Sequence, residues 1–254
     1  SGVFQNLQLS SNSMTGKIPT SLGKHCFAMS LKVVQLDDNA FTGSIPSMNA
    51  LSSLEVWTTE NNQFTGPFPD SSGMFELTTL GLQLTADQST LPIAEKCAPN
   101  VRVLRLSTNM DDGAIPSVAS LSADALYVLQ LTGGFKGEIP QGFMNTIGEW
   151  QNLKHLGFTP SYYWKTGDLT GEMFHPRYTY QGKTNPNELT GEFPTWSSPK
   201  LPAFRTGIFS VHLSHNTFTG EFPPLAFRNM TSIRYAAGAN NKFNSVDFSR
   251  LHGT

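Results

Sequence analysis

Carboxylate and imidazole side chains are the groups in this sequence that could perform acid–base or metal chemistry. Adjacent Asp–Asp pairs begin at Asp37 and at Asp111. Neighbouring side chains of an extended segment point to opposite sides, so neither pair forms a carboxylate dyad across a substrate. His212 and His215 diverge on a strand, and no Cys or carboxylate is placed to complete a metal site with them. We therefore predict no catalytic residue, no metal site and no cofactor.

Ring-bearing side chains are concentrated in one stretch, which makes recognition the stronger chemical prediction. Between residues 159 and 188 the rings belong to Tyr162, Tyr163, Trp164, Phe174, His175, Tyr178 and Tyr180, and Lys165 and Arg177 lie among them. Clustered Tyr and Trp suit recognition of peptides or sugar faces. The alternative is a small aromatic core that folds this stretch onto the rest of the chain.

A repeated template must position these groups. The sequence LKVVQLDDNAFTGSIP at residues 31–46 has the same skeleton as IFSVHLSHNTFTGEFP at residues 208–223. Apolar positions recur with a period of two before an Asn, and a Thr-Gly-x-apolar-Pro turn follows. A period of two predicts a short strand, and recurrence in register predicts one strand per copy in a parallel sheet.

The Asn of each copy is predicted to turn the chain out of its strand. Its buried amide can pair with backbone groups of adjacent coils that would otherwise lack partners. The predicted ladder consists of Asn12, Asn39, Asn62, Asn109, Asn187, Asn216 and Asn241. The Gly of each turn permits a tight bend, and the Pro fixes φ where the return path begins.

The full template resembles the leucine-rich repeat, in the variant typical of plant receptor-like proteins, receptor kinase ectodomains and polygalacturonase inhibitors. The resemblance implies a leucine-rich-repeat solenoid, a curved right-handed superhelix. Its parallel β-sheet would line the concave face, and short helical turns and extended segments would form the convex face. It also implies an extracellular or cell-surface location and binding of partners at the concave face.

Residues 1–254 are predicted to form a single solenoid of about nine or ten repeats. An aromatic-rich insertion at about residues 159–188 interrupts it, because the strand half of a separate repeat is missing there, and a short aberrant repeat is the alternative. Solenoid ends need capping, and no Cys-rich cap flanks the repeats, so we expect a fragment of a longer chain.

The outward strand positions are predicted to form a solvent-facing concave surface, with an acidic patch near its start. Together with the insertion, they give the candidate binding residues Gln35, Asp37, Asp38, Thr58, Glu60, Arg105, Gln130, Tyr162, Tyr163, Trp164, Tyr178, Tyr180 and His212. An ordinary solvated sheet face is the alternative interpretation.

Composition excludes several classes of partner. Charged residues make up 14% of the chain and the net charge is −2, whereas nucleic acid calls for a basic stripe. No apolar run is long enough to span a membrane. Cys26 and Cys97 are predicted to lie about three coils, ~14 Å, apart, which is too far for a disulfide. Asn229 begins one glycosylation sequon.

These observations predict a non-catalytic extracellular or cell-surface module that binds a protein, peptide or glycan. The alternative is a structural role, in which the surfaces assemble with sister subunits or with the rest of a longer chain.

Overall fold

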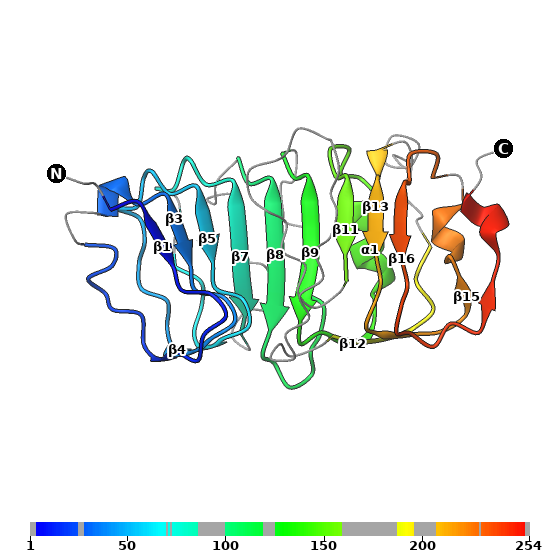
Figure 1. Ribbon diagram of the computed structural model, residues 1–254, viewed down its shortest axis with the longest axis horizontal. Helices are drawn as coiled ribbons and strands as arrows, with labels where there is room; N and C mark the ends of the chain where they lie inside the picture. The colour runs from blue at the N-terminus through cyan, green and yellow to red at the C-terminus, as the bar shows by residue number, and fades with distance from the viewer. Residues whose placement is uncertain are drawn as a thin grey trace.

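A parallel sheet runs the length of the molecule in the computed structural model (Figure 1), which describes residues 4–24, 28–69, 71, 73–85, 100–118, 125–158, 187–195, 207–228 and 230–251. The sheet has nine strands in chain order, one beside the next. They are β1 (Asn6–Gln8), β3 (Val33–Gln35), β5 (Val56–Thr58), β7 (Thr79–Leu84), β8 (Val103–Thr108), β9 (Val128–Gly133), β11 (His155–Gly157), β13 (Ser210–His212) and β16 (Tyr235–Ala237).

The strands are held in register by their inward apolar side chains. Val34 pairs with Trp57, Leu80 with Leu104, and the inward row continues in this way from strand to strand. The four side chains named here are at most 1% exposed, and Leu7 and Ala236 at the two ends of the row are partly buried. Because each coil covers the apolar face of the next, stability is a sum of nearest-neighbour contacts. The predicted solenoid with a parallel sheet is confirmed.

Hydrogen bonds confirm the ladder at Asn39, Asn62, Asn187, Asn216 and Asn241, whereas among the described residues Asn12 bonds only within its own coil. Asn62 shows the pattern: its Nδ2 donates to the Leu36 carbonyl of the preceding coil at 3.0 Å, and its Oδ1 accepts from the Phe41 amide at 3.0 Å. Just before five of the ladder Asn residues, the backbone is left-handed, with φ between 52° and 61°; these positions are Ser11, Asp38, Asn61, His215 and Asn240. The turn therefore combines a left-handed residue with an amide that bridges two coils.

Small secondary sheets follow the turns. One joins β2 (Thr15–Gly16), β4 (Ala40–Gly43) and β6 (Gln63–Phe64), another joins β10 (Lys136–Glu138), β12 (Glu188–Gly191) and β14 (Thr217–Phe218), and a third joins β15 (Glu221–Phe222) and β17 (Ser245–Val246). The Thr-Gly turns supply the bend, as predicted, because Gly43 and Gly191 have φ values of 73° and 74°.

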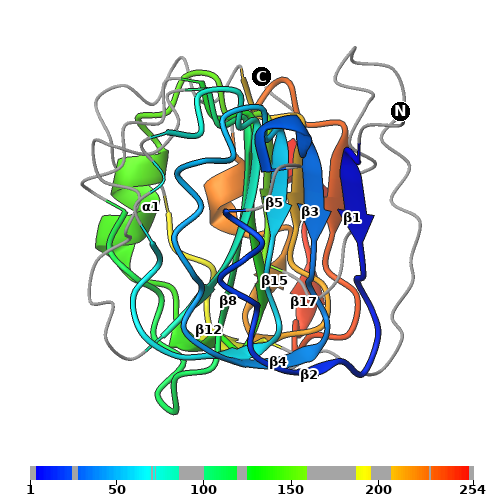
Figure 2. The same ribbon diagram turned by 90° about the vertical axis from the view of Figure 1, so that its left-hand side faces the viewer.

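The described parts of the return paths contain little helix. The helical segments among these residues are η1 (Ala28–Ser30), α1 (Gln141–Ile147), η2 (Leu225–Phe227) and η3 (Phe248–Leu251). Figure 2 shows α1 on the side of the solenoid opposite β3 and β5. Met48 and Phe143 belong to the buried core there, whereas Phe75 is 63% exposed.

Candidate binding surface

The middle row of outward residues lies in the predicted register. Gln35 pairs with Thr58, Thr58 with Gly81, and Gly81 with Arg105. The row continues through Gln130, Gly157, His212 and Ala237. The sequence therefore predicted correctly which side chains share this face of the sheet.

The predicted exposure of this row was wrong. Gln35 is half-buried, but Thr58 is 0% exposed, Arg105 7%, Gln130 1% and His212 2%. Part of the reason lies in the two glycines of the row. The Glu60 carboxylate occupies the space that a Cβ on Gly81 would need, and Gln130 lies in the same way over Gly157. Side chains of neighbouring coils thus lean over the glycines and shield one another from water.

The acidic patch is an ordered hydrogen-bonding group rather than a solvated cluster. Asp37 is fully buried, and it accepts hydrogen bonds from Ser10 Oγ at 2.8 Å and from Thr58 Oγ1. Asp38 is half-buried and accepts a hydrogen bond from Asn61 Nδ2 at 2.9 Å. Each carboxylate is therefore held by a side chain from a neighbouring coil.

Glu60 and Arg105 form a buried ion pair across the sheet. Arg105 Nε lies 2.8 Å from Glu60 Oε1, with side-chain exposures of 8% and 0%. Burial raises the pKa of Glu60 to about 8, while the positive charge of Arg105 opposes the rise and Asp37 adds to it. Desolvation is the largest cause of this rise in pKa, and it outweighs the attraction of Arg105.

Two buried histidines lie further along the same face. His155 Nδ1 lies 2.7 Å from Ser210 Oγ, and His212 lies on the adjacent strand. Burial lowers the pKa of both residues to about 4; the charge of Lys154 adds to the effect on His155, and His155 adds to that on His212. Both imidazoles are therefore neutral at pH 7.

An apolar outward row beside the middle row was missed at the sequence level. Val56, Val103 and Val128 are 6%, 7% and 1% exposed, and they line up with Thr79 and His155. A recurring β-branched residue just before the inward Leu was the signal that could have revealed this row. The outward face is consequently part apolar and part polar.

Several predicted residues lie outside the described part of the chain. They are the insertion residues Tyr162, Tyr163, Trp164, Tyr178 and Tyr180, the sequon residue Asn229, and Cys26 and Cys97. Among the residues that the structure does describe, no group of three or more His, Cys, Asp or Glu side chains could hold a metal ion. No helix in the same residues is long and apolar enough to cross a membrane.

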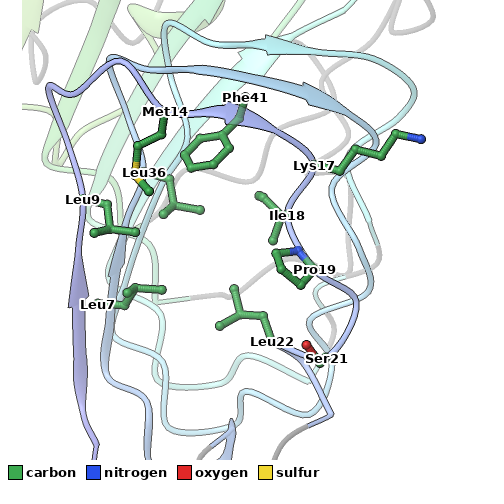
Figure 3. A pocket seen from close by; sticks show the side chains of 10 residues that line it. All are labelled: Leu7, Leu9, Met14, Lys17, Ile18, Pro19, Ser21, Leu22, Leu36 and Phe41. Atoms are coloured by element: carbon green, nitrogen blue, oxygen red, sulfur yellow. The ribbon is translucent and has the colours of Figure 1, made fainter.

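An apolar pocket of about 390 Å³ opens at the N-terminal end of the solenoid (Figure 3). Leu7 and Leu9 of the first coil face Ile18 and Leu22 across it, and Leu36 and Phe41 of the second coil form its floor. Val34 and Leu36, the second-coil counterparts of Leu7 and Leu9, are buried, whereas Met14 beside the pocket is 39% exposed. Among the described residues, none covers this end of the core as a neighbouring coil covers the inner coils.

Family comparison agrees with this architecture. A family model for the Leucine Rich Repeat matches residues 4–25, which form the first copy of the template. Further copies recur in register along the nine-stranded sheet. The chain is therefore a parallel-sheet solenoid, and its first copy matches the Leucine Rich Repeat model.

Several solved structures are similar to this solenoid. A plant ice-binding protein is 18% identical, with a TM-score of 0.53 and coverage of 94% of this chain and 65% of that chain. A TDR receptor is 20% identical, with a TM-score of 0.49 and coverage of 93% and 35%. The LRR ectodomain of the Arabidopsis thaliana receptor kinase GASSHO1/SCHENGEN3 is 21% identical, with a TM-score of 0.44 and coverage of 94% and 24%.

The likeness to the ice-binding protein shows a shared fold. The solenoid spans 35% and 24% of the lengths of the TDR receptor and the GASSHO1/SCHENGEN3 ectodomain. No curated protein matches the sequence.

Proposed function

We propose that this solenoid is a non-catalytic extracellular or cell-surface module that binds a protein or peptide, with a glycan as the alternative ligand. The observation that supports this best is the set of ionisable side chains built into the outward face of the sheet. Asp37, Glu60 and Arg105 are buried and tied to residues of neighbouring coils. A solenoid needs apolar side chains on its inward rows for stability, whereas burying ionisable outward side chains costs desolvation, which a role in holding a recognition surface in place would explain.

The burial of the middle row changes which residues would contact a ligand. Thr58, Glu60, Arg105, Gln130 and His212 would support the surface from below. Gln35 and Asp38 remain half-buried and would contact the ligand directly. The proposed contacts from the insertion are Tyr162, Tyr163, Trp164, Tyr178 and Tyr180, as aromatic anchors of the kind that dominate binding energies.

Binding to immobilised libraries of defined peptides and of oligosaccharides would test this proposal. We expect saturable one-to-one binding of a ligand from one library. Trp164→Ala should weaken binding by more than about tenfold, as expected for an aromatic hot spot. Lys242→Ala, at an exposed position away from the outward face, is the control. Binding that is not saturable, or that Trp164→Ala leaves unchanged, would contradict the proposed role of the insertion.

Secretion has its own test. The intact mass of the native protein, before and after glycosidase treatment, should show a glycan at Asn229 if the chain passes through the secretory pathway. An unmodified Asn229 would leave the extracellular location without this support.

The pocket at the N-terminal end favours a second candidate function, assembly with another subunit. Phe4, Met14 and Met29 are 46%, 39% and 72% exposed near this end, and β1 is an edge strand of the sheet. Exposed apolar side chains around an open edge are a typical assembly surface. Analytical ultracentrifugation would decide: a monodisperse monomer at high concentration contradicts assembly, and a large regular complex dissociated by Met29→Glu supports it.

Ice binding, the property named for one similar structure, is not proposed. It would require a regular ladder of like side chains, whereas the middle row mixes Gln, Thr, Arg and His.

A further inference from the structure

A row of alternating cationic and aromatic residues precedes five consecutive strands. Backbone hydrogen bonds link its members in order: Tyr127 to Arg102 at 2.8 Å, Lys154 to Tyr127 at 2.9 Å, Phe209 to Lys154 at 2.8 Å, and Arg234 to Phe209 at 2.9 Å. The row Arg102–Tyr127–Lys154–Phe209–Arg234, here called the entry row, follows the edge where β8, β9, β11, β13 and β16 begin, at the top of the sheet in Figure 1.

The side chains of the entry row support one another. Lys154 Nζ lies 5.8 Å and Arg234 Cζ 5.7 Å from the centroid of the Phe209 ring, which both cations share. The Tyr127 ring contacts the His155 ring at 5.2 Å, and His155 lies 6.4 Å from Phe209. The aromatic rings and Lys154 are half-buried, while Arg102 and Arg234 are exposed. The side chains of the entry row are thus fixed by their neighbours and remain partly accessible to solvent.

The positive charge of the entry row is not neutralised within the described residues. At the N-terminal end of the same edge, Lys32 pairs with Glu55 at 2.6 Å. In contrast, Arg102, Lys154 and Arg234 form no ion pair with any residue that the structure describes. Three cations thus remain together on a chain whose net charge is −2. This local excess fits an anionic partner.

The spacing of the cations indicates which backbone conformation of that partner would match it. Cations stand on every second coil, and adjacent strands are about 4.8 Å apart, so their spacing is about 9.6 Å. A ligand in extended β conformation presents the side chains of one face about every 6.8 Å, which does not match the spacing of the cations. A polyproline-II helix rises about 3.1 Å per residue with three residues per turn, which gives about 9.3 Å between like faces.

We propose that the entry row binds a polyproline-II peptide with an acidic residue at every third position. Its carboxylates would meet Arg102, Lys154 and Arg234 in turn, and proline rings between them would pack on Tyr127 and Phe209. Aromatic surfaces bind polyproline-II segments because such segments are already ordered and lose little entropy on docking. This assignment rests on the proposed peptide-binding function and names a surface and a ligand for it.

A fluorescence anisotropy titration with two synthetic peptides tests the assignment on the intact chain. The first peptide consists of four Glu-Pro-Pro units; the second has the same composition, with the Glu residues in adjacent pairs separated by Pro runs. We expect the first peptide to bind at least about tenfold more tightly, because only its acids match the cation spacing. Added salt should weaken the binding of the first peptide, because it screens the attraction between opposite charges.

Variants of the entry row provide the matched controls. Arg234→Glu should weaken binding of the first peptide by at least about tenfold, since it reverses an exposed charge in the row. Phe209→Leu should weaken it several-fold by removing the ring that both cations share. Lys242→Glu makes the same charge change at an exposed residue outside the row and should leave binding within about twofold.

Equal affinity for the two peptides, or no effect of Arg234→Glu, would overturn the proposal. If a uronic acid polysaccharide binds more tightly than the peptides and Arg234→Glu abolishes its binding, the ligand of the entry row is a glycan and the peptide proposal is wrong. Absence of binding to both peptides, while another ligand still binds in a Trp164-dependent manner, would refute the entry row and leave the proposed function intact.

Discussion

Two regions of the outward sheet face hold buried ionisable groups, and burial shifts the pKa values of the two regions in opposite directions. In the acidic region, Glu60 is held beside Arg105, and burial raises its pKa to about 8. In the histidine region, His155 and His212 remain neutral because burial lowers their pKa values to about 4. The backbone is the same repeated coil in both regions. The fold therefore leaves outward chemistry free to vary, and each region has its own pH response.

Removal of Arg105 should produce the largest difference between the regions. Arg105→Met leaves Glu60 buried without its partner, and breaking a buried ion pair costs about 3–5 kcal/mol. We expect the unfolding free energy, measured by chemical denaturation, to fall most above pH 8, where Glu60 would have to ionise. At pH 6 the loss should be smaller, because Glu60 can remain protonated. An equal loss at both pH values would contradict a charge-based role for Arg105.

The two glycines of the middle row give a matched comparison of packing. A Cβ at position 81 would overlap the Glu60 carboxylate, whereas one at position 157 would lie 3.2 Å from Gln130 Cγ. We expect Gly81→Ala to cost about 1–3 kcal/mol, as overpacking does, and Gly157→Ala to cost less than about 1.5 kcal/mol because Gln130 can shift. Thermal denaturation of both variants checks the order, and a larger loss for Gly157→Ala would contradict the described packing.

The sequence predicted the framework because the framework is local. The inward Leu positions, the ladder of Asn39 and Asn62, and the Thr-Gly turns recur at fixed offsets within each copy, so one copy explains the others. The register of the outward rows followed from the same template. These features need no knowledge of distant residues.

The burial of the outward face could not be predicted in this way, because it depends on contacts between copies. Glu60 leans over Gly81 and pairs with Arg105, which lies two coils away. The entry row was missed for a related reason. Lys154 and Phe209 are 55 positions apart in sequence, and only the observed register places them side by side.

Because the pKa of Glu60 is raised, the unfolding free energy of the protein should fall as pH rises. The Glu60 pKa is about 8 in the folded chain against 4.5 as the ordinary value, so between these limits the folded state binds more protons than the unfolded state. The unfolding free energy then decreases with pH across this window. Glu60→Gln should flatten the decrease between pH 7 and 8, which lies above the window between about 4 and 6.5 in which His155 and His212 contribute. An unchanged slope would place the Glu60 pKa elsewhere.

The histidine region should show the smallest effect and the opposite sign. His212 has a pKa of about 4 when folded against 6.5 ordinarily, so the unfolded chain binds the extra proton between these values, and stability falls as pH drops through this window. His155 contributes in the same direction. Above pH 4.5 the protonation of Glu60 partly offsets the loss.

The double variant isolates this contribution. In a Glu60→Gln background, His212→Gln should remove about half of the loss of unfolding free energy between pH 6.5 and pH 4, because His155 alone then retains a lowered pKa. Urea denaturation across this range measures it, and Glu60→Gln alone is the control. If the acid-side loss persists in full without His212, its imidazole is not the buried neutral group that distinguishes the histidine region from the acidic one.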